Sequence, residues 1–517
     1  MKNCLFRLTC IGLLLGGASA ACAQNQTPDV SPILPEDSLP LRLSIEQAEF
    51  SLPSGVQSYV AGTFGGRWLI VAGRVNGLHG FGTNNFPPNE QNETVFVVDP
   101  LGKTVATRSL AAPGSGLAQP QVDLLSVTSA QSYQLGSTLY MAGGYGIDTA
   151  TGTFTTKDAL TAIDVPGLMK WVVNPSLGDT AARHIRQIHD PVFQVTGGAM
   201  KRGADGVTLL MLGQNFVGDD VFVDGTYTEQ VRRFRIVDDG VGLSIVPLSP
   251  LPAQPDADYR RRDLNVVPLI RDGQDVGWAA LSGVFTPGNG VWTVPVDIAT
   301  DGTPSMADPA NPATFKQGMN GYASANFGAY SASTRQMYTV LLGGISFGYF
   351  TNGALATDAE LPFINQVTTI RHGSDGIVSQ YIMSSEYPVI ASTGSNPGNP
   401  LLFGAGARFF SAGGVPAYGN GVLDLDQLGG SQPHVIGYIV GGIMSTLPNT
   451  NTRSDTAASP YVFKVTLTST LPRPVQRATP VPTLAQYALL ALALLVGSLG
   501  VRSLRTDHLG SHSREWE

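Results

Sequence analysis

The stretch LYMAGG, from Leu139 to Gly144, decides the fold because copies of it recur along the chain. It is a short apolar run of the kind that forms a β-strand, and it ends in glycine. Comparable runs end at Gly73, Gly213, Gly283, Gly343 and Gly441. The copies that end at residues 73, 143, 213 and 283 are 70 residues apart. Repetition at such a spacing indicates a repeat fold.

Each copy has similar neighbours. A second β-type run precedes it, as in SVTSAQSYQL before Leu139, and a hairpin follows, as in ETVFVVDPLGKTVATRSL after Gly73. Asp and Gly in the connecting turns tolerate the backbone angles that tight connections need. Every unit is therefore predicted to hold four strands, and four-stranded units repeated radially form a β-propeller. A stacked pair of β-sandwiches is the alternative architecture.

The two chain ends supply the missing strand of the last unit. After the sixth copy, GYIVGG, only one convincing strand follows, SPYVFKVTLT, before the proline-rich LPRPVQRATPVP. Residues 41–50, LRLSIEQAEF, form a strand without a unit of its own. We therefore predict an all-β, six-bladed propeller over residues 41–471, closed by pairing residues 41–50 with residues 460–468. Such closure removes the exposed edges of an open array.

The glycines carry a resemblance to a known family. In kelch-type propellers the second strand of each blade ends in paired glycines. Three copies show the pair, at Gly143-Gly144, Gly343-Gly344 and Gly441-Gly442. The other three match its first member only, at Gly73, Gly213 and Gly283. The family's tryptophan on the fourth strand appears once, as Trp171, and the chain thus resembles a kelch-like propeller.

The N-terminus has the layout of a secretory signal peptide. A basic start, the apolar run 8–17 and small residues up to Ala23 follow one another. We predict a signal peptide over residues 1–23 and a flexible linker over residues 24–40, with lipidation at Cys22 as the alternative. A cut after Ala23 also removes all the cysteines of the chain, so burial of a core must hold the exported domain together.

Charge and loop composition argue against several partners. The net charge is −8, and no basic patch with interleaved aromatic residues occurs, so nucleic acid is not an expected partner. His184 and His189 lack a third ligand nearby, and the loop with Asp219, Asp220 and Asp224 matches no EF-hand spacing. We therefore predict neither a metal ion nor a cofactor.

The C-terminus predicts a membrane segment. Residues 484–501 are an uncharged, mostly apolar run, followed directly by Arg502 and Arg505. As a helix this run would span about 27 Å, which predicts one transmembrane helix in the inner membrane and a cytoplasmic tail at 506–517. Residues 472–482 are rich in proline and predict a stiff linker.

Residues 481–505 also resemble the IPTL-CTERM sorting signal of Gram-negative bacteria. The matching positions are Val481, Pro482, Thr483, Leu484, Tyr487, Arg502 and Arg505. The resemblance implies that an exosortase, a membrane transpeptidase-like enzyme, recognises the tail and that the protein goes to the cell surface. Proline keeps the backbone extended at the point that the enzyme must grip. A plain membrane anchor is the alternative.

Charged residues in the loops before the first strands of the repeats are the candidate ligand-binding groups. These predicted rim residues are Asp123, Arg186, His189, Asp190, Arg260, Arg262 and Asp263. Alignment of the repeats places them on adjacent blades at the channel mouth, where arginines could hold a carboxylate or an acidic sugar in bidentate fashion. The alternative is that Arg–Asp pairs bridge neighbouring blades and stabilise the ring.

These features predict an exported, surface-sorted module of the bacterial envelope that binds a glycan or a protein or serves as a scaffold. The alternative is a carbohydrate-active enzyme at the propeller mouth, such as a sugar epimerase similar to the kelch-like sialic acid mutarotases. Convergence of Arg186, His189, Arg260 and Asp263 in one pocket would favour the enzyme. Separate pairing of these side chains would favour the binding module.

Overall fold

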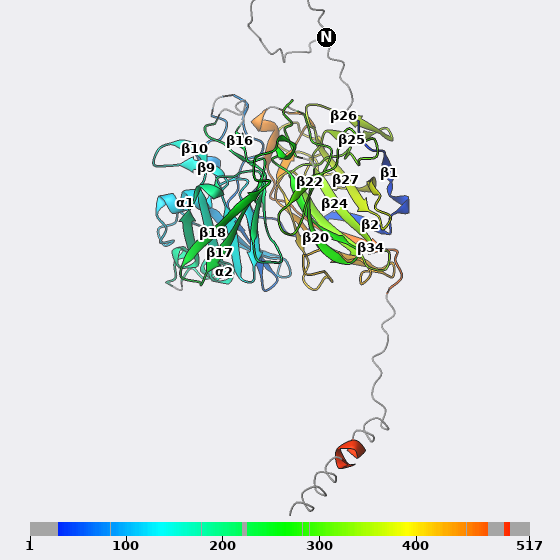
Figure 1. Cartoon of the computed structure of the whole chain (residues 1–517). Coiled ribbons are helices and arrows are strands. Elements are labelled where there is room, and N and C mark those ends of the chain that lie inside the picture. The colour runs from blue at the N-terminus through cyan, green and yellow to red at the C-terminus, as the bar shows by residue number, and fades with distance from the viewer. Residues whose placement is uncertain are drawn as a thin grey trace, which may run out of the picture. The chain divides into compact units, whose positions relative to one another are not determined.

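The computed structural model describes residues 29–473, except 83, 177, 220–224, 282, 289 and 451, together with residues 491–496. The chain divides into two compact units, residues 1–472 and 473–517. All the described sheets lie in the first unit (Figure 1). The predicted signal peptide at 1–23 lies outside the described residues.

Five sheets contain four antiparallel strands each. The first holds β3 (Val60–Phe64), β4 (Arg67–Val71), β5 (Thr94–Asp99) and β6 (Thr104–Ser109). The second holds β7 (Gln131–Leu135), β8 (Thr138–Ala142), β11 (Ala159–Asp164) and β12 (Ile185–His189). The third holds β13 (Ala199–Arg202), β14 (Thr208–Met211), β17 (Val231–Asp238) and β18 (Leu243–Leu251). The fourth holds β19 (Asn265–Arg271), β20 (Gln274–Leu281), β21 (Val296–Ile298) and β22 (Pro304–Met306).

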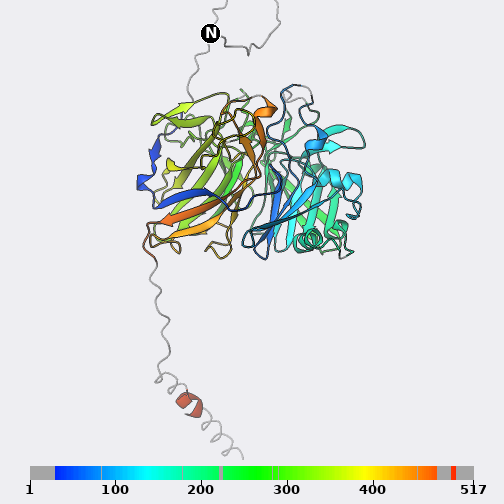
Figure 2. The same cartoon turned by 180° about the vertical axis from the view of Figure 1, so that it is seen from behind.

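The remaining four-stranded sheet joins the two ends of the propeller. It holds β29 (Arg408–Ser411), β31 (Pro433–Val440), β34 (Val462–Ser469) and β2 (Leu41–Gln47). β2 pairs antiparallel with β34, from Leu41 opposite Ser469 to Gln47 opposite Phe463, and the two strands lie side by side in Figure 2. The predicted closure is confirmed. It follows from the alternation in LRLSIEQ, which buries Leu41, Leu43 and Ile45 on one face of the sheet.

One further sheet departs from the predicted four-stranded unit, because it has six strands. Its central strands are β23 (Ala325–Ser331), β24 (Gln336–Ile345), β27 (Phe363–His372) and β28 (Val378–Glu386). β30 (Leu423–Asp424) and β1 (Ile33–Pro35) add to its two edges in parallel. β1 and the 3₁₀ turn η1 (Glu36–Ser38) lie within residues 24–40, so the expectation of a flexible linker was wrong for residues 33–38.

The sheets surround a common axis. The innermost strands β7, β13, β19, β23 and β29, together with Ser58 and Tyr59 directly before β3, line one central cavity. Each pair of neighbouring sheets encloses its own hydrophobic cluster, and one of these clusters packs Trp68 of the first sheet against Phe410 of the closing sheet. The fold is therefore an all-β propeller.

The glycines that end the second strands connect neighbouring sheets. Their amides donate to backbone oxygens in the loop before the first strand of the next sheet. The bonds run from Gly73 to Val127, Gly144 to Val195, Gly213 to Arg261, Gly344 to Phe403 and Gly442 to Val56. The geometry requires positive φ at two successive residues, for example +62° and +83° at Gly143 and Gly144. Ala72 and Leu212 hold the first of these positions, at φ +63° and +58°. Gly73 and Gly213 therefore match the second member of the glycine pair, and our alignment to its first member was wrong.

Connections between the second and third strands carry small hairpins. These are β9 (Tyr145–Asp148) with β10 (Thr153–Thr156), β15 (Gln214–Asn215) with β16 (Thr226–Tyr227), β25 (Gly348–Thr351) with β26 (Ala354–Thr357), and β32 (Ile443–Ser445) with β33 (Thr456–Ala458). The labelled hairpin strands lie at the top of the propeller in Figure 1, and α2 lies at the opposite end. The other short elements are α1 (Gln119–Leu125), α2 (Val165–Val173), η2 (Pro88–Glu90), η3 (Ala181–His184), η4 (Pro191–Phe193), η5 (Ala257–Tyr259) and η6 (Arg453–Asp455).

The second repeat corrects two sequence predictions. ALTAIDVPGLMKWVV forms β11 followed by α2 instead of a hairpin, because Pro166 suits the first turn of a helix. Trp171 is fully buried on α2 and does not occupy a fourth strand. The fourth strand is β12, which contains Arg186 and His189, so these two residues do not lie in a loop.

Beyond residue 473, the C-terminal unit is described only at residues 491–496, which are helical. The rest of the predicted helix 484–501, the linker from residue 474 and the tail 506–517 lie outside the described residues. Within the described part of the chain, no helix is long and apolar enough to cross a membrane.

Candidate functional site

Arg186 bridges two neighbouring sheets. Its Nη2 donates to Oδ2 of Asp238 over 2.8 Å, and the hydroxyl of Tyr140 donates to the same oxygen over 2.9 Å. Arg186 lies on β12 of the second sheet, whereas Asp238 ends β17 of the third. Burial alone would raise the pKa of Asp238, but hydrogen bonds from Arg186, the Gly240 amide and Tyr140 outweigh it and lower the pKa.

His189 and Asp123 lie away from the central axis and border a second cavity of about 350 Å³. Nδ1 of His189 lies 2.8 Å from Oδ1 of Asp158. Asp123 is buried on α1, where its carboxylate accepts hydrogen bonds from the amide and hydroxyl of Thr149 and from Gln119. Asp123 therefore fixes a connection between elements and does not begin an inner strand.

Asp190 has a local role. Its side chain accepts a hydrogen bond from the Val192 amide over 2.8 Å and caps the short turn η4. Side-chain caps of this kind satisfy a backbone donor that the turn leaves free.

Arg260, Arg262 and Asp263 do lie together. The guanidinium carbon of Arg260 is 3.9 Å from the ring centre of Tyr227, and Nε of Arg262 donates to the hydroxyl of the same tyrosine over 3.1 Å. Nη1 of Arg262 donates to Oδ2 of Asp263 over 2.8 Å. Of the predicted rim residues the structure thus groups these three and places Asp123 and His189 at another cavity. Arg186 and Asp190 are not among the residues that line either cavity.

Asp263 also belongs to a ring of backbone hydrogen bonds at the axis. Six residues that precede the innermost strands share a left-handed backbone, with φ between +48° and +66°: Ser58, Ser129, Gly197, Asp263, Ala323 and Gly406. Backbone amides of this set donate to backbone oxygens of the same set, from Ser58 to Gly406, Ser129 to Ser58, Gly197 to Ser129, Asp263 to Gly197 and Gly406 to Ala323. These bonds offset the strain of left-handed backbone at residues other than glycine.

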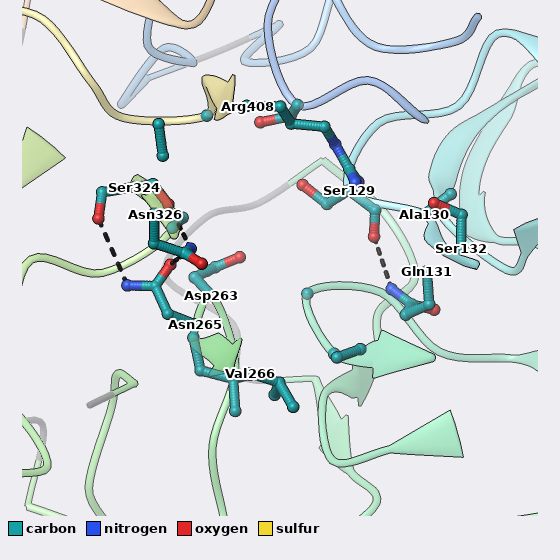
Figure 3. Close-up of a pocket in the computed structure, with 18 of the residues that line it drawn as sticks. Ser129, Ala130, Gln131, Ser132, Asp263, Asn265, Val266, Ser324, Asn326 and Arg408 are labelled. Atoms are coloured by element: carbon teal, nitrogen blue, oxygen red, sulfur yellow. Dashed lines mark hydrogen bonds between the residues drawn. The ribbon is translucent and has the colours of Figure 1, made fainter. Parts of the chain in front are cut away.

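The central cavity starts at this ring and measures about 360 Å³. Figure 3 shows polar side chains from four sheets around it, including Ser132, Asn326 and Arg408. Lys201 on β13 and Arg408 on β29 are cationic groups of the lining. Burial and the nearby Arg408 lower the pKa of Lys201 to about 8, and burial lowers the pKa of Arg408.

Sequence reasoning missed Lys201 and Arg408. The available signal was their type and place, since Arg408 lies in the β-type run LLFGAGARFF and Lys201 directly follows the β-type run DPVFQVTGGAM. The alignment of the repeats singled out charged residues in the loops, where charges are common. It did not extend to charged residues at equivalent positions of the inner strands. Such charges are rare inside a fold without a specific reason.

In the part of the chain that the structure describes, no group of three His, Cys, Asp or Glu side chains could hold a metal ion. The sorting-signal positions Val481, Pro482, Thr483, Leu484, Tyr487, Arg502 and Arg505 lie outside the described residues.

Comparison with known proteins identifies the C-terminal segment. A family model described as the IPTL-CTERM motif matches residues 479–506, which confirms the sorting signal predicted at 481–505. The motif indicates export to the cell surface and processing by an exosortase-type enzyme. A solved structure named "Structure of YjhT" is similar at 13% identity with a TM-score of 0.42, over 81% of this chain and 99% of that chain. No curated protein matches the chain.

Proposed function

We propose that this protein is a six-bladed, kelch-like propeller displayed on the surface of a Gram-negative bacterium, where it acts as a binding or scaffold module. The observation that carries the proposal is the IPTL-CTERM match at residues 479–506, directly after a closed propeller. The blade count treats the six-stranded sheet as one blade widened by β1 and β30. Six chain segments, each at or directly before an inner strand, line one cavity and support that count.

The pairing of the predicted rim residues favours binding over carbohydrate chemistry. Arg186 is bonded to Asp238 and His189 to Asp158, while Arg260 is stacked on Tyr227. A sugar epimerase at the mouth would need acid and base groups within reach of one substrate atom. Side chains committed to separate partners serve the stability of the propeller, so we propose a glycan or protein ligand that is bound without chemical change.

The path to the surface uses both chain ends. A signal peptide at 1–23 starts export, and a helix at 484–501 holds the precursor in the inner membrane with residues 506–517 in the cytoplasm. An exosortase-type enzyme then cuts near Pro482 and releases the propeller with its linker. Uncut protein would remain anchored in the membrane.

The test is a Pro482→Ala variant in a host with an exosortase, with an epitope tag after Glu517. Pro474→Ala is the matched control, because Pro474 lies in the same proline-rich segment but outside the motif match at 479–506. Wild type and Pro474→Ala are expected to lose the tag and reach the surface, whereas Pro482→Ala keeps the tag in the membrane fraction. Equal tag retention in all three proteins would contradict the proposal.

A further inference from the structure

We propose that the central cavity binds a small oxyanion, a carboxylate or a phosphate, between Lys201 and Arg408. This inference deepens the proposed binding function by naming the ligand class, and it places the site at residues outside the predicted rim. It rests on the arrangement of charges around the cavity, on the freedom of their donors and on the cavity's size.

The lining carries more positive than negative charge. Lys201, Arg408 and Asp263 are the charged side chains among the residues that line the cavity. The carboxylate of Asp263 is already paired, with its Oδ2 2.8 Å from Nη1 of Arg262. Among the described residues, no ion pair joins Lys201 or Arg408 to a carboxylate. Two uncompensated cations in a partly dehydrated space favour a bound anion.

Arg408 is held in place by the protein with most of its donors unspent. Its Nε donates to the backbone oxygen of Tyr59 over 2.8 Å, which fixes the guanidinium plane. Arginine has five N–H donors in a rigid fork, and the fork matches the two oxygens of a carboxylate or phosphate. A guanidinium anchored through Nε still presents Nη1 and Nη2 to a ligand.

Lys201 approaches from a different sheet. It lies on β13, whereas Arg408 lies on β29, and the ammonium of Lys201 has no hydrogen-bond partner among the described residues. Ser132 adds a hydroxyl to the same lining, whereas the side-chain amide of Asn326 already donates to Asn265 and to the Ser324 carbonyl. The donors of Lys201, Arg408 and Ser132 thus converge from three sheets, which suits a compact ligand with several oxygens. A cavity of about 360 Å³ falls at the lower end of the range for small-molecule sites.

The protonation of Lys201 couples the site to pH. The charged or titratable groups that face it across the cavity are Arg408, Asp263 and Tyr59. Burial and Arg408 lower the pKa of Lys201 to about 8 without a ligand, so the ammonium form predominates only below that pH. A bound anion favours the ammonium form, and anion affinity is therefore expected to fall as the pH rises above about 8.

The experiment is calorimetric titration of the full chain with inorganic phosphate, with succinate and with neutral glycerol. One equivalent of at least one anion should bind, and glycerol should not. Which anion binds tells a phosphate ligand from a carboxylate ligand. Lys201→Gln and Arg408→Gln should each weaken binding about tenfold or more.

Matched controls remove charges outside the cavity. Lys103→Gln and Arg335→Gln delete the same charges from exposed ion pairs with Glu49 and Asp272, and should leave anion affinity unchanged. If the cavity variants fold poorly, acylation of lysines in the unaltered protein replaces them. The bound anion should then protect Lys201 and not Lys103.

The outcomes separate this inference from the proposed function. Absence of binding by either anion to the folded protein, or equal affinity in the cavity and control variants, overturns the oxyanion site. Neither result touches the sorting of the Pro482→Ala variant, which tests surface display independently.

Discussion

Gly144→Ala tests how the glycine pairs hold neighbouring sheets together. Gly144 has φ +83°, and its amide donates to Val195 of the next sheet over 2.9 Å. A Cβ built at this position would lie 2.6 Å from Cγ2 of Val127 and 2.8 Å from Cβ of Ala130. Both neighbours are buried side chains with little room to move.

The expected loss of stability has two parts. Left-handed backbone costs an L-residue roughly 1–2 kcal/mol, and overpacking of a filled core typically costs about 1–3 kcal/mol. The lower entropy of alanine in the unfolded chain returns about 0.4–1 kcal/mol. The free energy of unfolding should therefore fall by about 2–4 kcal/mol for Gly144→Ala.

Gly66→Ala separates the two parts. Gly66 has a similar φ of +77° in the turn between β3 and β4, but nothing lies within 4 Å of a Cβ built there. This variant should lose only about 1 kcal/mol, from strain less unfolded-state entropy. The assay is urea unfolding of both variants and wild type, followed by tryptophan fluorescence and near-ultraviolet circular dichroism. If the two variants lose equal stability, close packing at the glycine pair does not hold the sheets in register.

Three further predictions concern the stability of the propeller. Arg186→Gln should lower the free energy of unfolding by about 2–3 kcal/mol, because it leaves the Asp238 carboxylate, only 6% exposed, without its cation. The control Arg183→Gln, at an exposed ion pair, should lower it by less than about 1 kcal/mol. Equal losses for the two variants in urea unfolding would contradict a stabilising role for the Arg186–Asp238 ion pair. Because the pKa of Asp238 is lowered in the folded protein, its contribution to stability is present above about pH 4 and is lost as the pH falls through the folded value. Between pH 6 and pH 3, the free energy of unfolding should therefore fall less in Arg186→Gln than in wild type. Deletion of residues 29–47 removes β1 and β2 and exposes the edge of β34, so aggregation is expected, and a soluble monomer with native near-ultraviolet dichroism would argue against the closure.

Local patterns in the sequence were enough to predict an all-β propeller and the closure of its ring, although they missed α2 and the added strands β1 and β30. Alternating Leu41, Leu43 and Ile45 predict a strand with one buried face, and the orphan status of that strand points to β34 at the other end of the chain. The sorting signal is equally local, since its motif, apolar run and arginines follow one another within residues 481–505. Each of these features depends on neighbours in sequence, so spacing and residue type carry the information.

Only the tertiary structure decided which side chains meet. Arg186 and His189 do not lie in a loop before an inner strand, because Pro166 starts a helix and β12, which contains both residues, is the fourth strand. Lys201 and Arg408 are more than 200 residues apart, yet they line one cavity because two inner strands lie at the same axis. Burial and the nearby Arg408, which lower the pKa of Lys201, arise from that packing and have no counterpart in the order of residues along the chain.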